Sequence, residues 1–253
     1  MYEVTLTDRT GRVWPLTTRR GRGVWLAEEG IDGMVGQVDV VAVNAVDSPG
    51  QRVDHIRVEP MAGTLNLIIT PTATESIDDL VGALRAGLST RDAGSLRIAG
   101  PRSDLSCRVR LEEVPPALRS NTHRVRSLTV ELPLVADGGV WWSGEESGTG
   151  RIVNGGDVTV RPRLVWSGSG GPVVSPSGAV FLLPAVTGTR VLYLDADESC
   201  LVTTTAGGVD GPLWGRLRGV TVPEGVPPGA TRTWVLPAGV ELRWRIGYLD
   251  PWR

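Results

Sequence analysis

A run of alternating residues at 154–168 limits the folds open to this chain more than any other feature. It opens with Asn154-Gly155-Gly156, a turn signal because asparagine and glycine tolerate positive φ angles. Apolar or proline residues then occupy every second position: Val158, Val160, Pro162, Leu164 and Trp166. This period of two is typical of a strand with one face on a core and one face in solvent. Because Pro162 cannot donate a ladder hydrogen bond, we expect this strand to lie at a sheet edge.

Composition favours an all-β protein. The 253 residues include 33 Gly and 18 Pro but only 1 Phe, and 41% of them are hydrophobic. Turn residues at this density, between short Val, Leu and Thr runs, indicate many short strands, and the length suffices for two domains with separate cores. The formal net charge is -2, which indicates neither nucleic-acid binding nor anionic membranes. All 26 basic residues are arginine, a bias that we attribute to a GC-rich genome.

The first half predicts a β-rich domain over residues 1–142. Strands are expected at 2–6, 13–16, 37–46, 53–61, 64–70, 96–98, 105–111 and 124–135, with a turn at Asp8-Arg9-Thr10-Gly11. The run 37–46 is almost continuous Val and Ala, so we expect a strand buried on both of its faces.

One helix is expected, over Ile77–Leu88. Ser76 is a good N-cap and Asp79 follows three residues later, which is the spacing of a capping box. Asp78 and Asp79 lie in the first turn, where the helix dipole favours carboxylates. One apolar stripe at helical spacing contains Ile77, Leu80, Val81, Leu84 and Leu88.

The second half predicts a β-sandwich at 151–253, after a linker at 143–150 that is rich in Gly, Ser and Glu. Its expected strands are Val158–Trp166, Ala179–Leu183, Arg190–Asp195, Cys200–Thr204, Leu213–Arg218, Arg232–Leu236 and Val240–Leu249. About seven short strands separated by Gly and Pro turns are typical of a sandwich. Trp166 and Trp244 share faces with aliphatic residues, so both are expected in the core.

No catalytic or cofactor-binding set is evident, and no enzyme activity is predicted. The two histidines, His55 and His123, lack metal-ligand spacing, and no nucleophile elbow or phosphate-binding loop occurs. Asp195, Asp197 and Glu198 could hold Ca²⁺, but a solvated turn is the favoured interpretation. Cys107 and Cys200 are expected as buried free thiols. The N-terminus reads as a strand and no apolar run spans a bilayer, so we expect folding in a cytoplasm.

Trp214 is the one candidate binding residue. On the expected strand it shares a face with Pro212, Arg216 and Arg218. It could anchor a subunit interface or stack on a sugar. A half-buried Trp with arginine stems packed over it is the favoured alternative.

Three segments together resemble the phage distal tail protein (Dit) family. They are the turn-opened run at 154–168, the segment Glu131–Asp137 followed by Val140-Trp141-Trp142, and Leu236-Pro237-Ala238-Gly239 before the last strand. Val240 stands where the family often has Asn. The resemblance implies a mainly β fold: a split β-barrel-like, tail-tube-like N-terminal domain with one α-helix, then a C-terminal galectin-like β-sandwich.

The resemblance also implies a role. Distal tail proteins are structural virion proteins, and their homo-hexameric ring joins the tail tube to the tail tip or baseplate. The implied partners are the tail tube protein, the tape-measure protein and the tail hub or tip protein. Genome DNA would pass through the ring without specific binding. The implied location is the virion tail tip, after assembly in the host cytoplasm and without a membrane partner. The alternative that we keep open is a carbohydrate-binding β-sandwich adaptor for host cell-wall attachment, using Trp214.

Overall fold

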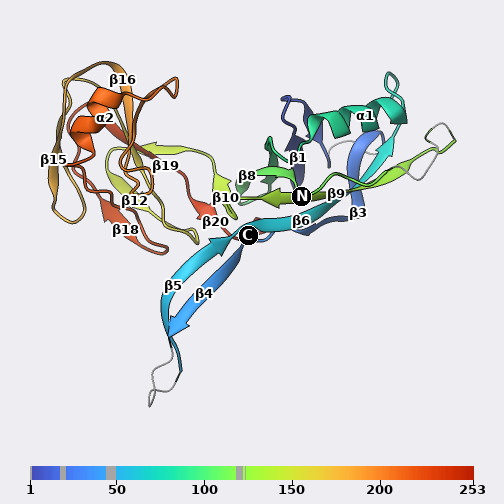
Figure 1. Ribbon diagram of the computed structural model, residues 1–253, viewed down its shortest axis with the longest axis horizontal. Coiled ribbons are helices and arrows are strands. Elements are labelled where there is room, and N and C mark those ends of the chain that lie inside the picture. Colours follow the sequence, from blue (N-terminus) through green and yellow to red (C-terminus); the bar gives the residue numbers. More distant parts are fainter. Residues whose placement is uncertain (1, 18–20, 44–49, 118–121, 123) are drawn as a thin grey trace. The chain divides into compact units, whose positions relative to one another are not determined.

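The computed structural model describes residues 2–17, 21–43, 50–117, 122 and 124–253 (Figure 1). The chain divides into two compact units. Unit 1 comprises Met1–Trp142 and Tyr248–Arg253, and unit 2 comprises Ser143–Gly247. The segment 143–150, where the sequence suggests a linker, contains a strand of unit 2, and residues 248–253 return to unit 1.

Unit 1 is built on one large antiparallel sheet. Its elements are β1 (Glu3–Thr7), β2 (Val13–Pro15), β3 (Gly23–Gly33), β4 (Gln37–Val43), β5 (Arg52–Glu59), β6 (Met61–Thr70), α1 (Ile77–Gly87), β7 (Gly94–Ala99), β8 (Asp104–Leu111) and β9 (Leu128–Ala136). The strand order is β2-β1-β7-β8-β9-β6-β3. Two short strands at the connections to unit 2, β10 (Trp141–Ser143) and β20 (Gly247–Tyr248), pair with each other, and β10 also pairs with β8.

The sheet of unit 1 curls back on itself without closing. The two ends of the strand order approach each other, and Leu26 N in β3 donates a backbone hydrogen bond of 2.9 Å to Leu16 O just after β2. Side chains alternate across the sheet, so Leu65, Leu67 and Ile69 of β6 are fully buried in the core. The predicted mainly β fold with a split-barrel-like first half is therefore confirmed, and the barrel is not closed.

The predicted helix is confirmed as α1, and its capping box is complete. Ser76 Oγ accepts from Asp79 N at 3.2 Å, and Asp79 Oδ2 accepts from Ser76 N at 3.0 Å. The expected apolar stripe lies buried against the sheet. The helix ends at Gly87, where a Cβ would lie 2.2 Å from Asp8 Oδ2. Glycine at this position lets the β1–β2 turn pack directly on the helix end.

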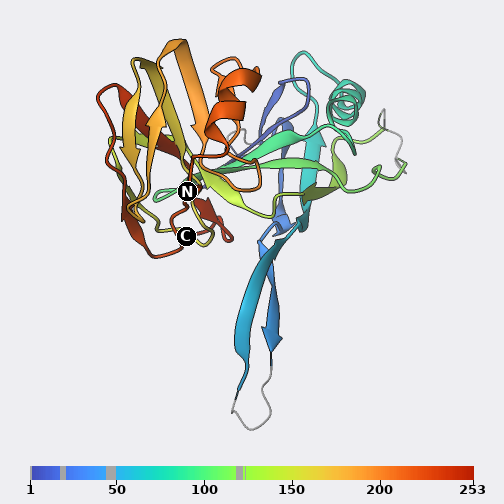
Figure 2. The ribbon, with the colours of Figure 1, turned by 60° about the vertical axis from the view of Figure 1, so that its left-hand side comes forward.

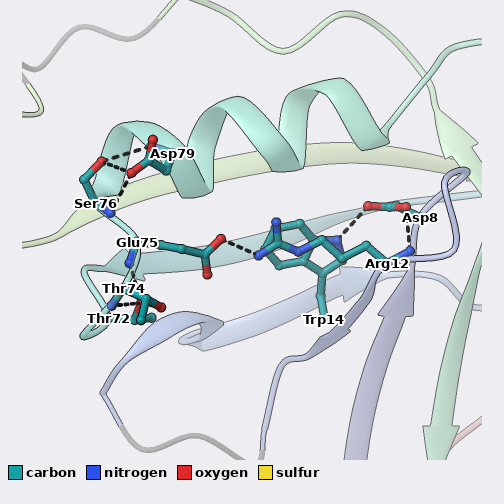
Figure 3. A network of polar contacts seen from close by, with 8 residues as sticks. All are labelled: Asp8, Arg12, Trp14, Thr72, Thr74, Glu75, Ser76 and Asp79. Carbon is teal, nitrogen blue, oxygen red and sulfur yellow. Dashed lines mark hydrogen bonds and ion pairs between the residues drawn. The ribbon is translucent and has the colours of Figure 1, made fainter.

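A buried carboxylate organises that turn (Figure 3). Asp8 Oδ1 accepts from Thr10 N, Thr10 Oγ1 and Arg12 N, and Asp8 Oδ2 accepts from Trp14 Nε1 at 3.0 Å. Burial acts to raise the pKa of Asp8, but the hydrogen bonds from Thr10, Trp14 and the backbone outweigh it and lower that pKa. The Arg12 guanidinium lies 4.0 Å from the Trp14 ring centroid and pairs with Glu75 at 2.8 Å. The turn is thus tied to the segment before α1.

The prediction for residues 37–46 is wrong. β4 and β5 form a separate two-stranded hairpin that projects from unit 1, here called the arm (Figures 1 and 2). Val38, Val40 and Val41 are 44%, 41% and 47% exposed, not buried on both faces. A Val-rich run has the same sequence pattern in a buried interior strand and in a projecting hairpin. Periodicity therefore cannot distinguish these two structures. Residues 44–46 of this run lie outside the described residues.

Unit 2 is a sandwich of two β layers. Its elements are β11 (Glu146–Gly148), β12 (Arg151–Val153), β13 (Arg163–Gly168), β14 (Gly171–Val174), β15 (Val180–Leu183), β16 (Val186–Tyr193), β17 (Val202–Thr204), α2 (Gly211–Leu217), β18 (Thr231–Thr233) and β19 (Val240–Trp244). One layer has the order β11-β19-β13-β16-β17. The other contains the pairs β12-β18 and β14-β15, with a bridge from Val174 to Val235. Trp166 and Trp244 are buried in the core, as predicted.

Three local predictions for unit 2 are wrong. β13 lies centrally between β19 and β16, because the strand begins at Arg163 and Pro162 needs no ladder donor; its carbonyl accepts from Leu194 N at 3.0 Å. The expected strand at Leu213–Arg218 is helix α2. Asp210 caps it by accepting from Leu213 N at 3.2 Å, and a proline lies in its first turn. The Asn-Gly-Gly turn uses no positive φ at Gly155 or Gly156.

Asn154 serves that turn through its side chain. Its Nδ2 donates to Val158 O at 2.9 Å and to Val226 O at 2.8 Å, and its Oδ1 accepts from Gly156 N at 2.9 Å. A Cβ at Gly156 would lie 2.3 Å from Gly247 O. The glycine is therefore required by close packing, and the asparagine satisfies backbone groups in the interior.

Candidate functional site

The arm carries an apolar face that is exposed among the residues the structure describes. In the register, Val40 pairs with Ile56 and Ala42 pairs with Val53, beyond a bulge after Val41. Alternation places Val38 on the same face. We call Val38, Val40, Val53 and Ile56 the apolar face of the arm; their exposed fractions are 44%, 41%, 49% and 58%. Four neighbouring aliphatic side chains at this exposure are typical of a surface that another molecule covers.

The opposite face of the arm is polar near its base. Asp39 pairs with Arg57 across the strands, and Arg57 Nε lies 3.2 Å from Glu59 Oε1. The opposite face is therefore polar at its base, and it carries the exposed Val41 farther out. An isolated two-stranded hairpin is at best marginally stable in water. Contact with a second molecule would supply the packing that the arm lacks.

The base of the arm is packed closely enough to fix its direction relative to unit 1. Gly36 N donates to Leu249 O at 2.7 Å, and a Cβ at Gly36 would lie 2.6 Å from Leu249 Cδ2. Gly139 has φ +64°, and a Cβ there would lie 2.1 Å from Glu59 O. Both positions require glycine because backbone or side-chain atoms already occupy the space. The base of the arm is thus in close contact with residues 139 and 249 of the same unit.

A groove of about 830 Å³, here called the seam groove, lies beside the point where Leu26 N donates to Leu16 O. Leu16 and Thr17 line one side of it, and the β3 segment Trp25–Ile31 lines the other. Its end is formed by Tyr2 and Trp252, whose rings meet edge to face with centroids 5.3 Å apart. A large bulge widens β3 here, because Leu26 pairs with Leu67 but Ile31 pairs with Leu65.

Two features of the seam groove are unsatisfied. Trp25 Nε1 is buried and has no hydrogen-bond partner among the described residues. Glu28 and Glu29 are exposed, and neither carboxylate pairs with a cation within the described part of the chain. An apolar floor with an unused donor and two unused negative charges can hold an apolar segment that carries a basic residue.

Trp214, the candidate residue from the sequence, lies on α2. Its Nε1 donates to Ser199 O at 2.9 Å, the ring packs against the core of unit 2, and the Arg218 guanidinium lies 5.7 Å from the ring centroid. A groove of about 490 Å³ beside α2 is lined by Arg190, Asp210 and Arg216, but not by Trp214. The interface or sugar-stacking role of Trp214 stays a prediction.

The acidic turn at 195–198 lies against an arginine. Arg161 donates to Asp195 and, at 2.8 Å, to Asp197, so a cation of the chain already neutralises these carboxylates. Across the described residues, no group of three or more His, Cys, Asp or Glu side chains could hold a metal ion. Cys107 and Cys200 are buried and free, and burial raises the pKa of the Cys107 thiol.

Comparison with known proteins gives matches among solved structures alone. No protein-family model matches the chain, and no curated protein matches it. The SPP1 Dit (gp 19.1) protein, described as a paradigm of the hub adsorption apparatus in phages that infect Gram-positive bacteria, superposes with a TM-score of 0.64. The match covers 98% of this chain and 100% of that chain at 13% sequence identity.

This chain has the distal tail protein fold. Chains from the phage p2 baseplate in its activated conformation, one structure with strontium and one with calcium, agree with TM-scores of 0.54 and 0.52. Each is 8% identical to this chain and covers 97% of it, with 98% of the p2 chain matched. The resemblance that the sequence suggests to the distal tail family is therefore confirmed in the fold.

The sequence indicated neither the arm nor the seam groove as a site. No helix in the described ranges is long and apolar enough to cross a membrane. The candidate functional site thus consists of the apolar face of the arm and the seam groove, both in unit 1.

Proposed function

We propose that this chain is a structural virion protein of a phage tail, a distal tail protein whose homo-hexameric ring joins the tail tube to the tail tip or baseplate. The observation that carries the proposal is the projecting arm with an uncovered apolar face, in a chain with the distal tail fold. Full burial of an aliphatic side chain contributes about 1.5–3 kcal/mol. Because four side chains are roughly half exposed, covering them would contribute about 3–6 kcal/mol per arm.

The proposed partners follow from a position at the tube–tip junction. They are the tail tube protein, the tape-measure protein and the tail hub or tip protein, and assembly would take place in the host cytoplasm. Genome DNA would pass through the ring without specific binding. A formal net charge of -2 suits that passage, because a strongly basic lumen would retain phosphates. The role requires no enzyme activity and no cofactor.

The proposal is tested by the solution mass and shape of the purified protein. Light scattering is expected to give six times the chain mass of 27.0 kDa, and negative-stain images a ring with an open centre. Val40→Asp places a charge in the apolar face and is expected to give monomers. Val41→Asp is the matched control, because the neighbouring residue points to the opposite face and is similarly exposed.

The two variants separate assembly from folding. Each should keep the wild-type circular dichroism spectrum, since both side chains lie on the projecting arm. A wild-type protein that stays monomeric at every concentration would contradict self-assembly through the arm. So would a Val40→Asp protein that forms the same ring as the wild type.

A further inference from the structure

We propose that the seam groove of one copy receives the apolar face of the arm of the next copy. This inference rests on the proposed ring and names the surface that the arm occupies. The two surfaces are independent features of unit 1: the arm is a separate two-stranded sheet, and the groove lies between β2 and β3. No residue of the arm lines the groove of its own chain, so an arm seated there would come from another copy.

The first argument is apolar complementarity. The groove has a volume of about 830 Å³, which is enough for several side chains, and its apolar lining includes Leu16, Trp25 and Ile31. The arm offers Val40 and Ile56 as a directly opposed pair on its uncovered face. Joining the two removes the exposed apolar surface of both from water in one contact.

The second argument is charge. Glu28 and Glu29 line the groove, and neither forms an ion pair in the described part of the chain. Arg52 begins β5 next to Val53 of the apolar face, and it too has no ion-pair partner among the described residues. An arm seated in the groove would bring an unpaired guanidinium to two unpaired carboxylates, which fixes the register of the contact.

The third argument is the unused donor. Trp25 Nε1 is buried and lacks a partner among the residues that the structure describes. β4 and β5 pair only with each other in the described sheet, so each has a backbone edge with free carbonyls. Because this N–H is covered, a carbonyl at the arm's edge would reach it only after the Trp25 ring turns toward the groove, and the new hydrogen bond would then remove the cost of an unsatisfied buried donor.

The geometry also accounts for a closed ring. Each chain carries one arm and one groove at different places, so the contact is head to tail. Such a contact leaves a free arm and a free groove on every open chain of copies, and only closure covers all of them. A two-fold dimer in which two copies exchange arms would also cover both surfaces, and it would end the covalent ladder at the dimer.

The test is a disulfide between Val40→Cys on the arm and Glu29→Cys on the groove. Both native thiols are buried, which keeps the background low. After mild oxidation, the double variant should give a ladder of covalent species that ends at the hexamer. An equal mixture of the two single variants should give covalent dimers and nothing larger, because each chain then carries one accessible thiol. Val180→Cys, exposed on unit 2, replaces Val40→Cys in the control pair and should not cross-link.

A charge exchange tests the same contact without cysteines. Reversing Glu28 and Glu29 together to Arg should raise the concentration at which the ring dissociates at least tenfold, and adding Arg52→Glu should recover most of that loss. One outcome would overturn the groove proposal while the proposed function stands. It is a ring of the expected mass that forms no covalent species in the cysteine variant and dissociates at the same concentration after the charge reversal. Absence of any ring in the wild type would instead overturn the proposed function.

Discussion

Replacing Asp8 with Asn should destabilise unit 1 by about 2–4 kcal/mol. The carboxylate accepts three hydrogen bonds on Oδ1 and one from Trp14 on Oδ2. Asn has a single oxygen, so either orientation of the amide turns an NH₂ group toward a donor. The better orientation keeps Thr10 and Arg12 and leaves Trp14 Nε1 without an acceptor. An unsatisfied buried donor costs about 1–3 kcal/mol, and the loss of charge from the remaining bonds adds about 1 kcal/mol.

The free energy of unfolding is measured in urea, with hydrogen exchange as the readout. Exchange in peptides from β1, β7 and α1 reports on unit 1 separately from unit 2. Trp14→Phe removes the indole donor. The loss of stability in the double variant Asp8→Asn/Trp14→Phe should therefore be smaller than the sum of the two single losses by about 1–2 kcal/mol. Additivity within about 0.5 kcal/mol would refute the assignment of the cost to the Asp8–Trp14 hydrogen bond.

The same residue predicts a pH dependence. Because the folded pKa of Asp8 is lowered, its stabilisation is fully present above the unfolded pKa and is lost as the pH falls through the folded value. The stability difference between wild type and Asp8→Asn should be constant from about pH 5 to 8 and shrink below about pH 4. A difference that persists unchanged at low pH would show that charge at this position contributes nothing.

Three further outcomes are expected. Gly139→Ala should weaken ring assembly in light scattering and lower the melting temperature, because its Cβ would lie 2.1 Å from Glu59 O. A ring and a melting curve like those of the wild type would contradict the close packing at the base of the arm. Asn154→Ala should destabilise unit 2 by about 1–3 kcal/mol in hydrogen exchange, since Val158 O and Gly156 N lose their partner while Val226 O keeps the bond from Val160 N. An effect under about 0.5 kcal/mol would contradict this role. Cys107 should resist alkylation in the native protein and react in urea, and rapid native labelling would show that burial does not protect the thiol.

Much of the fold follows from local pattern in the sequence. The capping box at Ser76 and the apolar stripe of α1 are local signals, because a helix satisfies its backbone within a few residues. Trp166 and Trp244 were placed in the core by parity alone, since alternate residues of a strand face opposite sides. The turn residues between short strands gave the mainly β class and the sandwich in the second half.

The candidate site depended on the tertiary structure. Val38 and Val40 look like residues of an interior strand, and only the pairing of β4 with β5 alone exposes their face. Pro162 suggested an edge, but the strand begins one residue later and lies in the middle of its layer. The seam groove joins Leu16, Trp25 and Trp252, which no local pattern relates. A sequence period fixes which residues share a face, because that depends on backbone geometry, whereas what covers that face depends on contacts between segments distant in the chain or between chains.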